Sequence, residues 1–552
     1  MKRNSVMENL RKYSGIWLLA VILLIQVLAL GYIGARRDGL HIDEHYSYIL
    51  SNSYGADRIT TAPEVWNRWM DGSEFQKFLA VEKGEQFAYG TVYANNAKDA
   101  HPPLFYFLLH TLCSLFPGVW SPWFGMGLNI LLILLAQIAL YGLSRKLMGN
   151  SLWAVVPVAI YGGMQVFADT ALFIRMYPLM TLLTVLLAWQ HYRLTVEEKK
   201  RSPIIWCGVL TFLGTFTQYY FAITAFFMAA AGCIFFIIRK NWKPLVAYAA
   251  AMLLGVLCVF VVFPAGITQI TGSETNNIGK EVAANILNFS GWGAAVLSMA
   301  KQMILGMLWG VKRCLPIAGI LAVITLAVLV VLRLRGKKTE QSTGNWKQIL
   351  IFGVVLAAIV GCAVLVISHI TGKFVYVRYL YNLFPLIALL CALALWLFAE
   401  AARLDKRVLA WGVIAVWLVS TATVAKEELC TYMFTDRAAE DAVVAQQCED
   451  KPLVVLNNGT THQPTALLHI FLNCDQMYMA NYEEVESMDS ILEQVDCSNG
   501  VVYLVLTDVS WSDGFAGDAL MTQIVEQSEI LGSYNRFGSC DFTTAYMALP
   551  EE

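Results

Sequence analysis

The sequence predicts a polytopic α-helical membrane protein with about 11 spans and a C-terminal extracytoplasmic α/β domain. Its 552 residues are 57% hydrophobic and only 14% charged, whereas about a quarter of the residues of a soluble protein are charged. Charge also divides the chain. Residues 1–424 carry 35 Lys and Arg against 19 Asp and Glu, and residues 425–552 carry 4 against 22. We therefore expect a basic membrane body, 1–424, and an acidic tail, 425–552, that is long enough to bury its own core.

Apolar runs of about 16–24 residues mark the predicted spans, because a helix needs about 20 apolar residues to cross the hydrocarbon core of a bilayer. Lys and Arg gather in every other connecting segment, so the positive-inside rule makes those segments and the N-terminus cytoplasmic. An odd number of spans then puts the tail outside a multi-pass protein of the cell membrane. The predicted spans are residues 15–34, 123–143, 151–168, 177–192, 203–219, 221–238, 244–265, 315–332, 349–370, 380–401 and 408–424.

Two apolar segments need their own assignment. Arg36 and Arg37 follow the first span, where a cleaved signal would end in small residues, so we predict an uncleaved anchor. Residues 102–117 are apolar enough to pass for a span, but one more crossing would move every later basic segment outside. We predict an interfacial or re-entrant helix on the outer surface, opened by Pro102 and Pro103. An ordinary short span is the alternative.

The connecting segments limit where chemistry can take place. The predicted cytoplasmic segments are short, and the sequence has neither a P-loop nor a GxGxxG after a strand, so no nucleotide-binding domain is predicted inside the cell. The first outer loop, residues 35–122, is long and mixes acids, histidines and aromatics. Loops of this length are usually functional or disordered, and this composition favours an ordered, functional one.

Two adjacent carboxylates, Asp43 and Glu44, follow the first span closely. A carboxylate near an apolar surface can have its pKa tuned and act as a general base. Alternatively, the pair faces the positive end of a helix that begins there. His41 and His45 are four residues apart and could share one face of that helix to bind a metal, but the pattern lacks a third ligand.

Cations and aromatics recur at the predicted outer ends of later spans, as Arg175 with Tyr177 and as Lys373 with Arg378 and Tyr379. A cation at the edge of the hydrocarbon costs a few kcal/mol unless an anion satisfies it. Arg suits bidentate binding of a phosphate. Snorkelling to lipid headgroups or pairing with loop carboxylates is the alternative explanation.

His101, Gln218 and Tyr219 complete the set of outer polar residues. His101 precedes two prolines and could supply a hydrogen bond to a cavity or flank a helix start, while Gln218 and Tyr219 could belong to an aromatic belt. Together, a carboxylate, cations for a phosphate and aromatics on which sugars stack suit transfer of a sugar from a lipid phosphate to a hydroxyl.

These motifs resemble the GT-C glycosyltransferases, and most of all their bacterial family-39 or protein-mannosyltransferase-like branch. The resemblance covers about residues 10–400 and is carried by Asp43-Glu44, the HPP at 101–103, the RMY at 175–177, the TQYYF at 217–221 and the Arg-Tyr at 378–379. It implies a GT-C-like membrane fold and a polyprenyl-phosphate sugar as donor, with inversion at the anomeric carbon. It makes Asp43 the catalytic base and puts the donor phosphate on Arg378, with Lys373 and Arg175 as weaker matches.

The resemblance also sets expectations for cofactors and partners. Some GT-C branches use a divalent metal with a second acidic motif in the second outer loop. Here that loop offers only Asp169, so we infer no metal and no other cofactor. The expected partners are the lipid-linked donor, membrane lipids, and an acceptor that is a glycan, a lipid or a protein. The acidic tail argues against nucleic acid.

The tail reads as a small α/β domain, because buried-strand patterns at 453–456 and 501–506 alternate with helical patterns near 488–495 and 518–529. The sequence thus predicts an integral-membrane hexosyl- or pentosyltransferase. Two alternatives stay open. One is a transporter or flippase of lipid-linked glycans, which would need ionisable residues near the middle of the membrane, where the sequence has few. The other is a non-catalytic relative that keeps the fold.

Overall fold

The computed structural model describes residues 2–54, 62–197, 201–272, 280, 284–286, 288–335, 346–371, 376–433, 435–457, 463–482, 488–506, 517–540 and 543–551. Contacts divide the chain into two compact units. The helical unit comprises Met1–Ala35, Asn96–Phe105 and Gly125–Thr431. The mixed unit comprises Arg36–Asn95, Tyr106–Phe124 and Tyr432–Glu552, so most of the first outer loop groups with the tail.

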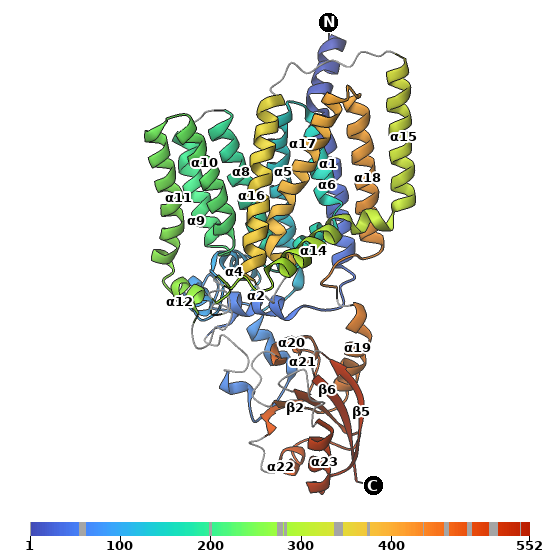
Figure 1. Ribbon diagram of the computed structural model, residues 1–552. Helices are drawn as coiled ribbons and strands as arrows, with labels where there is room; N and C mark the ends of the chain where they lie inside the picture. The colour runs from blue at the N-terminus through green and yellow to red at the C-terminus, as the bar shows by residue number, and fades with distance from the viewer. Residues whose placement is uncertain are drawn as a thin grey trace. The chain divides into compact units, whose positions relative to one another are not determined.

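The helical unit is a bundle of long apolar helices (Figure 1). Its elements are α1 (Lys2–Gly34), α5 (Pro122–Met148), α6 (Ser151–Gly162), α7 (Gln165–Leu172), α8 (Tyr177–Thr195), α9 (Arg201–Thr215), α10 (Phe221–Ile238), α11 (Trp242–Val262), α12 (Ala265–Thr271), α14 (Trp292–Arg313), α15 (Leu315–Leu334), α16 (Trp346–Ile370), the 3-10 helix η4 (Val377–Leu383), α17 (Phe384–Ala401) and α18 (Lys406–Lys426).

Among the described residues, nine helices are long and apolar enough to cross a membrane, or up to ten if the bent pair α6–α7 is one span. The chain is therefore a multi-pass membrane protein, although the count differs from the predicted 11. Predicted span 177–192 is α8, which buries Thr181, Thr184 and His191. Predicted span 203–219 is α9, which has only 15 residues. The two helices pack against each other, and α8 is mostly buried whereas α9 is exposed along one face.

Helix α14 was not among the predicted spans, because Lys301, Lys312 and Arg313 interrupt its apolar pattern. It has 22 residues and is apolar enough to count as a candidate span. In Figure 1 it runs at a steep angle to α16 and α18 rather than alongside them. Its slanting course and its lysines are typical of a helix at a membrane surface.

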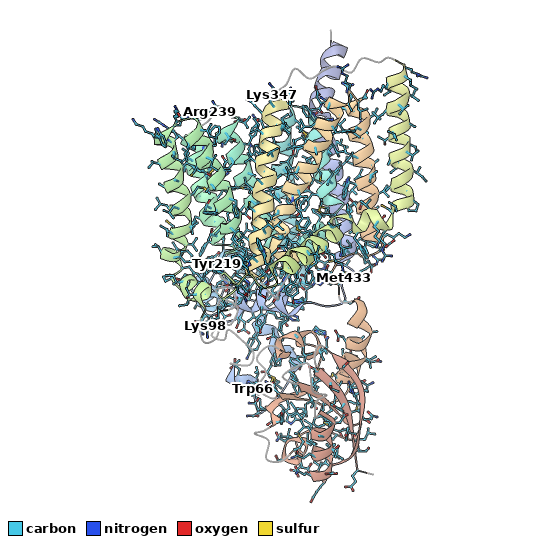
Figure 2. The ribbon with its side chains drawn as sticks, viewed as in Figure 1. Trp66, Lys98, Tyr219, Arg239, Lys347 and Met433 are labelled. Atoms are coloured by element: carbon cyan, nitrogen blue, oxygen red, sulfur yellow. The ribbon has the colours of Figure 1, made fainter. Side chains whose placement is uncertain are left out.

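The predicted cytoplasmic ends share one end of the helical unit. Figure 2 shows Arg239 and Lys347 at that end, and Lys98 and Tyr219 at the opposite end. This clustering is the geometry that the positive-inside argument requires of basic connecting segments.

A six-stranded sheet forms the core of the mixed unit, in the order β1-β3-β2-β4-β6-β5. The central strands β3, β2 and β4 are parallel, and the β1–β3, β4–β6 and β6–β5 pairs are antiparallel. The strands are β1 (Trp69–Met70), β2 (Leu453–Asn457), β3 (Met477–Asn481), β4 (Val501–Leu506), β5 (Leu531–Cys540) and β6 (Thr543–Pro550).

The helices of the mixed unit are short. They are α2 (Ile42–Asn52), α3 (Tyr89–Ala97), α4 (Leu104–Ser114), α19 (Thr435–Glu449), α20 (Gln463–Ala466), α21 (Leu468–Phe471), α22 (Asp489–Leu492) and α23 (Gly517–Gln527), with 3-10 helices η2 (Pro63–Val65) and η3 (Gly72–Phe78). The predicted α/β tail is confirmed, including strands β2 and β4.

Helix α4 has 11 residues, about 16 Å, and is too short to span a bilayer.

The sheet reaches beyond the tail. Strand β1 comes from the first outer loop, and Trp69 and Met70 pair with Tyr478 and Met477 of β3. The indole N–H of Trp69 also donates to the carbonyl of Ile491, at 2.9 Å. Residues more than four hundred positions apart in the sequence thus share one hydrophobic core.

Candidate active site

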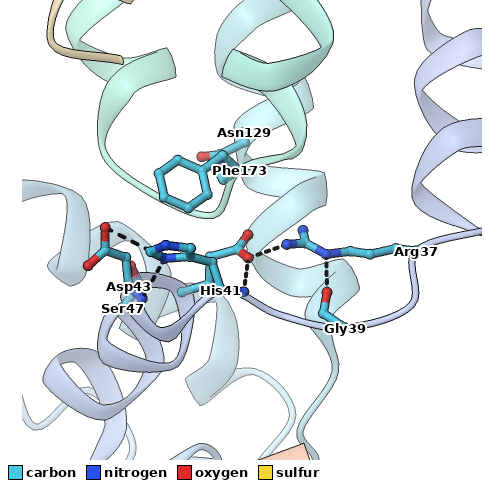
Figure 3. A network of polar contacts seen from close by, with 8 residues as sticks. Arg37, Gly39, His41, Asp43, Ser47, Asn129 and Phe173 are labelled. Atoms are coloured by element: carbon cyan, nitrogen blue, oxygen red, sulfur yellow. Dashed lines mark hydrogen bonds and ion pairs between the residues drawn. The ribbon is translucent and has the colours of Figure 1, made fainter. Parts of the chain in front are cut away.

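Helix α2 begins with a capping box that fixes the backbone around Asp43 (Figure 3). The backbone N–H of Asp43 donates to Nδ1 of His41, at 3.0 Å. The Glu44 carboxylate accepts from the backbone N–H of His41, at 2.7 Å. These reciprocal bonds satisfy donors that the first turn of a helix leaves open. The helix start that the sequence left as an alternative is therefore real, and Asp43 lies in its first turn.

Glu44 is fully buried and forms an ion pair with Arg37, whose side chain is 5% exposed. Arg37 is held in turn, because its Nε donates to the carbonyl of Gly39 (Figure 3). A buried carboxylate with these partners is committed to structure. The contacts of Glu44 therefore favour a role in holding the environment of Asp43.

Asp43 differs from its neighbour, since a quarter of its side chain is exposed. Its carboxylate lies 3.7 Å from Nδ1 of His41. That nitrogen already accepts a hydrogen bond from the Asp43 backbone and so has no proton to donate to the carboxylate. Asp43 is therefore the more accessible carboxylate of the pair.

His41 and His45 do not form the metal pair considered from their spacing. His41 caps α2, whereas His45 is buried and its ring stacks on His469 of α21, with centroids 6.4 Å apart. Burial lowers the pKa of His45 to about 3, and the nearby charges of His469 and Arg37 add to this effect. Within the part of the chain that the structure describes, no three His, Cys, Asp or Glu side chains are grouped to hold a metal.

In the helical unit, His101 lies between Asp99 and Arg175. Nδ1 of His101 is 2.8 Å from Oδ2 of Asp99, and Nε2 is 3.2 Å from a terminal nitrogen of Arg175. Arg175 is 4% exposed, whereas about a quarter of the Asp99 and His101 side chains is exposed. The structure thus brings together two predicted site residues, His101 and Arg175, that lie 74 positions apart in the sequence.

Phe173 joins Arg175 to Arg378. The backbone N–H of Arg175 donates to the carbonyl of Phe173 at 2.7 Å, which forms a tight turn, and the side chain of Asn129 donates to the same carbonyl at 2.7 Å. The guanidinium of Arg378 lies 5.7 Å from the Phe173 ring and 4.8 Å from that of Tyr376. Arg175 and Arg378 therefore both contact Phe173, Arg175 through its backbone and Arg378 through its guanidinium, and the aromatic faces partly desolvate Arg378.

The predicted aromatic and amide residues lie around these residues in two groups. Tyr177 is buried and stacks on Phe173, while Tyr379 packs 5.8 Å from the guanidinium carbon of Arg378. Gln218 accepts from the backbone of Tyr219, and the Tyr219 hydroxyl donates to Gln269 at 2.6 Å. Burial and the nearby Asp99 carboxylate raise the pKa of Tyr219.

Some predicted residues are not joined to the two arginines. Asp43 and Glu44 belong to the mixed unit, and Lys373 lies outside the described residues. Asp169, the acid of the second outer loop, accepts from the backbone N–H and the hydroxyl of Thr431, at 2.6 and 3.0 Å. Sequence reasoning missed Asp99, although its place two residues before His101 was a signal.

No protein-family model and no curated protein matches the sequence. Several solved structures are similar to this chain, and two of them are described here. ArnT from Cupriavidus metallidurans bound to undecaprenyl phosphate is 11% identical, with a TM-score of 0.48 over 97% of this chain and 98% of that one. The archaeal oligosaccharyltransferase AglB from Archaeoglobus fulgidus, in complex with an inhibitory peptide and a dolichol-phosphate, is 13% identical, with a TM-score of 0.42 over 90% of this chain and 70% of that one. Since both TM-scores lie below 0.5, the function proposed for this chain rests on its own residues.

Proposed function

We propose that this protein is an inverting membrane glycosyltransferase. It transfers a hexose or pentose from a polyprenyl-phosphate donor to a hydroxyl of a glycan, lipid or protein acceptor on the outer face of the membrane. The N-terminus is then cytoplasmic and the tail extracytoplasmic, in agreement with the clustering of basic segments at one end of the helical unit. The observation that carries the proposal is the environment of Asp43.

Asp43 is suited to be the general base. Its backbone is fixed by the capping box, its neighbour Glu44 is engaged by Arg37, and its own carboxylate is accessible. In the proposed reaction it takes the proton of the acceptor hydroxyl while that oxygen attacks the anomeric carbon. The bond from this carbon to the phosphate oxygen breaks, and its electron pair stays on the phosphate. Attack opposite the leaving group inverts the anomeric configuration.

Arg175 and Arg378 are suited to bind the donor phosphate. A phosphate monoester gains negative charge as the glycosidic bond breaks, so fixed guanidinium groups stabilise the transition state more than the ground state. The aromatic surroundings of Arg378 lower the local dielectric and strengthen this effect. We assign no metal ligand in the second outer loop, because both oxygens of Asp169 accept hydrogen bonds from Thr431.

The transporter alternative receives no specific support from the bundle. A transport path would need ionisable groups within the spans. Two pairs of buried polar side chains described there bond to each other: Gln137 donates to Gln26, and His191 pairs with the hydroxyl of Tyr248.

The test measures release of polyprenyl phosphate from a panel of polyprenyl-phosphate sugars, with candidate acceptors supplied. Wild type is compared with Asp43→Asn, which preserves size but removes the base. We expect turnover to fall by about 10²–10⁴-fold while binding of the donor is retained.

Asp71→Asn is the matched control in the same outer loop. Asp71 caps η3 from an exposed position, and Asn can make the same hydrogen bond, so turnover should be unchanged. Full activity of Asp43→Asn would show that Asp43 is not the base. Failure of wild type to release polyprenyl phosphate from any donor would contradict the proposed reaction class.

A further inference from the structure

Asp99, His101 and Arg175 form a chain of polar contacts whose proton positions follow from chemistry. A guanidinium is always protonated and only donates, so Nε2 of His101 must accept from Arg175. Nε2 then carries no hydrogen, and the imidazole proton is on Nδ1, where it is donated to Asp99. The structure therefore describes a neutral imidazole between a carboxylate and a cation, with a defined tautomer.

We infer that Asp99 is a positioning residue that acts through His101 to hold Arg175 in place for an anionic ligand. The inference rests on the proposed function, in which that ligand is the donor phosphate. Which ring nitrogen of a histidine accepts depends on the bond that the other nitrogen makes. Without Asp99, the ring could equally carry its proton on Nε2, which would then face the donors of Arg175.

The electrostatics of the three residues agree with this role. Arg175 is almost fully buried, and a buried cation is costly unless negative charge lies near it. Burial alone would raise the pKa of Asp99, but the hydrogen bond from His101 and the electrostatic effect of that residue, followed by the charge of Arg175, outweigh burial and hold that pKa below its usual value. Asp99 thus remains ionised at neutral pH and compensates Arg175 across the ring.

The segment that carries Asp99 is itself held on both sides. Gln269 donates to the carbonyl of Asn96 at 2.7 Å, and the N–H of Leu104 donates to the carbonyl of Phe216 at 3.3 Å. Gln269 also accepts from Tyr219. These bonds attach residues 96–104 to α12 and to the turn before α10. Asp99 is therefore a fixed group rather than the end of a mobile loop.

The test is a double-mutant cycle on direct binding of polyprenyl phosphate, measured without turnover. Asp99→Asn keeps shape but removes the charge, and its amide can turn either the NH2 or the oxygen toward His101, so the tautomer is no longer fixed. Arg175→Lys keeps charge but removes the planar fork. We expect each variant to bind about 10-fold more weakly than wild type. If Asp99 acts through Arg175, the double variant should bind no more weakly than Arg175→Lys alone. Thermal unfolding of each variant checks that the fold is kept, and Asp71→Asn serves as the control.

The outcomes separate this inference from the proposed function. Unchanged binding by Asp99→Asn, or a loss that adds fully to that of Arg175→Lys, would overturn the positioning role while leaving the donor assignment intact. Absence of binding by wild type would instead count against polyprenyl phosphate as the leaving group.

Discussion

At the scale of single residues, Asp43 and Glu44 show how neighbours in the sequence acquire opposite roles. Successive residues of a helix point about 100° apart, so one carboxylate of the pair enters the protein when the other faces out. Arg37 lies on the buried side and forms an ion pair with Glu44. Asp43 keeps an exposed carboxylate in a fixed position. Glu44 thus has structural contacts, whereas Asp43 is placed for the chemistry that we propose.

This division predicts that Glu44→Gln acts on stability. The amide can still accept from the backbone of His41, but it removes the negative charge that pairs with the buried Arg37. Breaking a buried ion pair in this way costs about 3–5 kcal/mol. We expect a lower unfolding temperature in detergent for Glu44→Gln and an unchanged one for Asp43→Asn. A Glu44→Gln variant as stable as wild type but inactive would place Glu44 in the chemistry.

His45 predicts a dependence of stability on pH. Its pKa falls from about 6.5 in the unfolded chain to about 3 in the folded protein, so only the unfolded state binds a proton between these values. The free energy of unfolding should therefore decrease as pH falls through this window, by up to about 1.4 kcal/mol for each pH unit. His45→Phe, which can still stack on His469, should remove this part of the slope. Unfolding curves of the two proteins with the same slope between pH 6 and 4 would contradict the assignment.

The sequence predicted residues whose chemistry is evident from their type, but not the contacts that connect them. Motifs pointed to Asp43, His101, Arg175 and Arg378. They could not reveal that the guanidinium of Arg378 lies over the ring of Phe173, because this depends on how α7 meets η4. Asp99 was missed for the same reason, since its role appears only when His101 approaches Arg175, 74 positions away.

At the scale of elements, the backbone carbonyls at the break between α6 and α7 have identifiable hydrogen-bond donors. The two helices, which the sequence predicted as one span, are bent by 72°. A bend frees backbone carbonyls, and inside a membrane these must find donors within the protein. The hydroxyls of Ser420 and Thr421 on α18 donate to the carbonyls of Gly163 and Gly162, at 2.7 and 3.3 Å. Because these donors lie more than 250 positions away, an apolar run alone could not predict the bend.

The bend also explains why glycines occur there. A Cβ on Gly163 would lie 2.5 Å from the backbone oxygen of Trp417, and one on Gly162 would meet the side chain of Gln26. The chain therefore turns where two neighbouring helices approach too closely for any side chain. Helix α7 then carries Asp169 to its partner Thr431 and leads into the Phe173 turn that supports Arg175.

At the scale of the whole molecule, charge and contacts divide the chain in different ways. Charge separates the chain at residue 424, whereas contacts group residues 36–95 with the tail. The reason is physical: β1 adds its backbone hydrogen bonds to the edge of the tail sheet, and Gly72 donates to the carbonyl of Cys474 at 2.8 Å. The edge of a sheet presents unpaired backbone N–H and C=O groups, which an extended segment can bond to whatever its side chains. The residue composition therefore does not predict this pairing.

This pairing predicts that the tail holds the loop that carries Asp43, and the prediction can be tested at Gly72. A Cβ there would lie 1.7 Å from the backbone oxygen of Phe471, which cannot move without shifting α21. The same unit contains α2, whose His45 stacks on His469 of α21. We expect Gly72→Ala to displace the loop from the tail and lower turnover about 10-fold or more, since misplaced catalytic groups lose rate steeply. Binding of polyprenyl phosphate should be retained, because Arg175 and Arg378 belong to the helical unit.

Gly90→Ala is the matched control for this substitution. Gly90 lies in the same loop, in α3, and a Cβ there would meet nothing within 4 Å. Its turnover and donor binding should both equal those of wild type. If Gly72→Ala also kept full turnover, attachment of the loop to the tail would not be what positions Asp43. If it lost donor binding together with turnover, the damage would extend to the helical unit, and the tail would have to act on the whole protein rather than on the base alone.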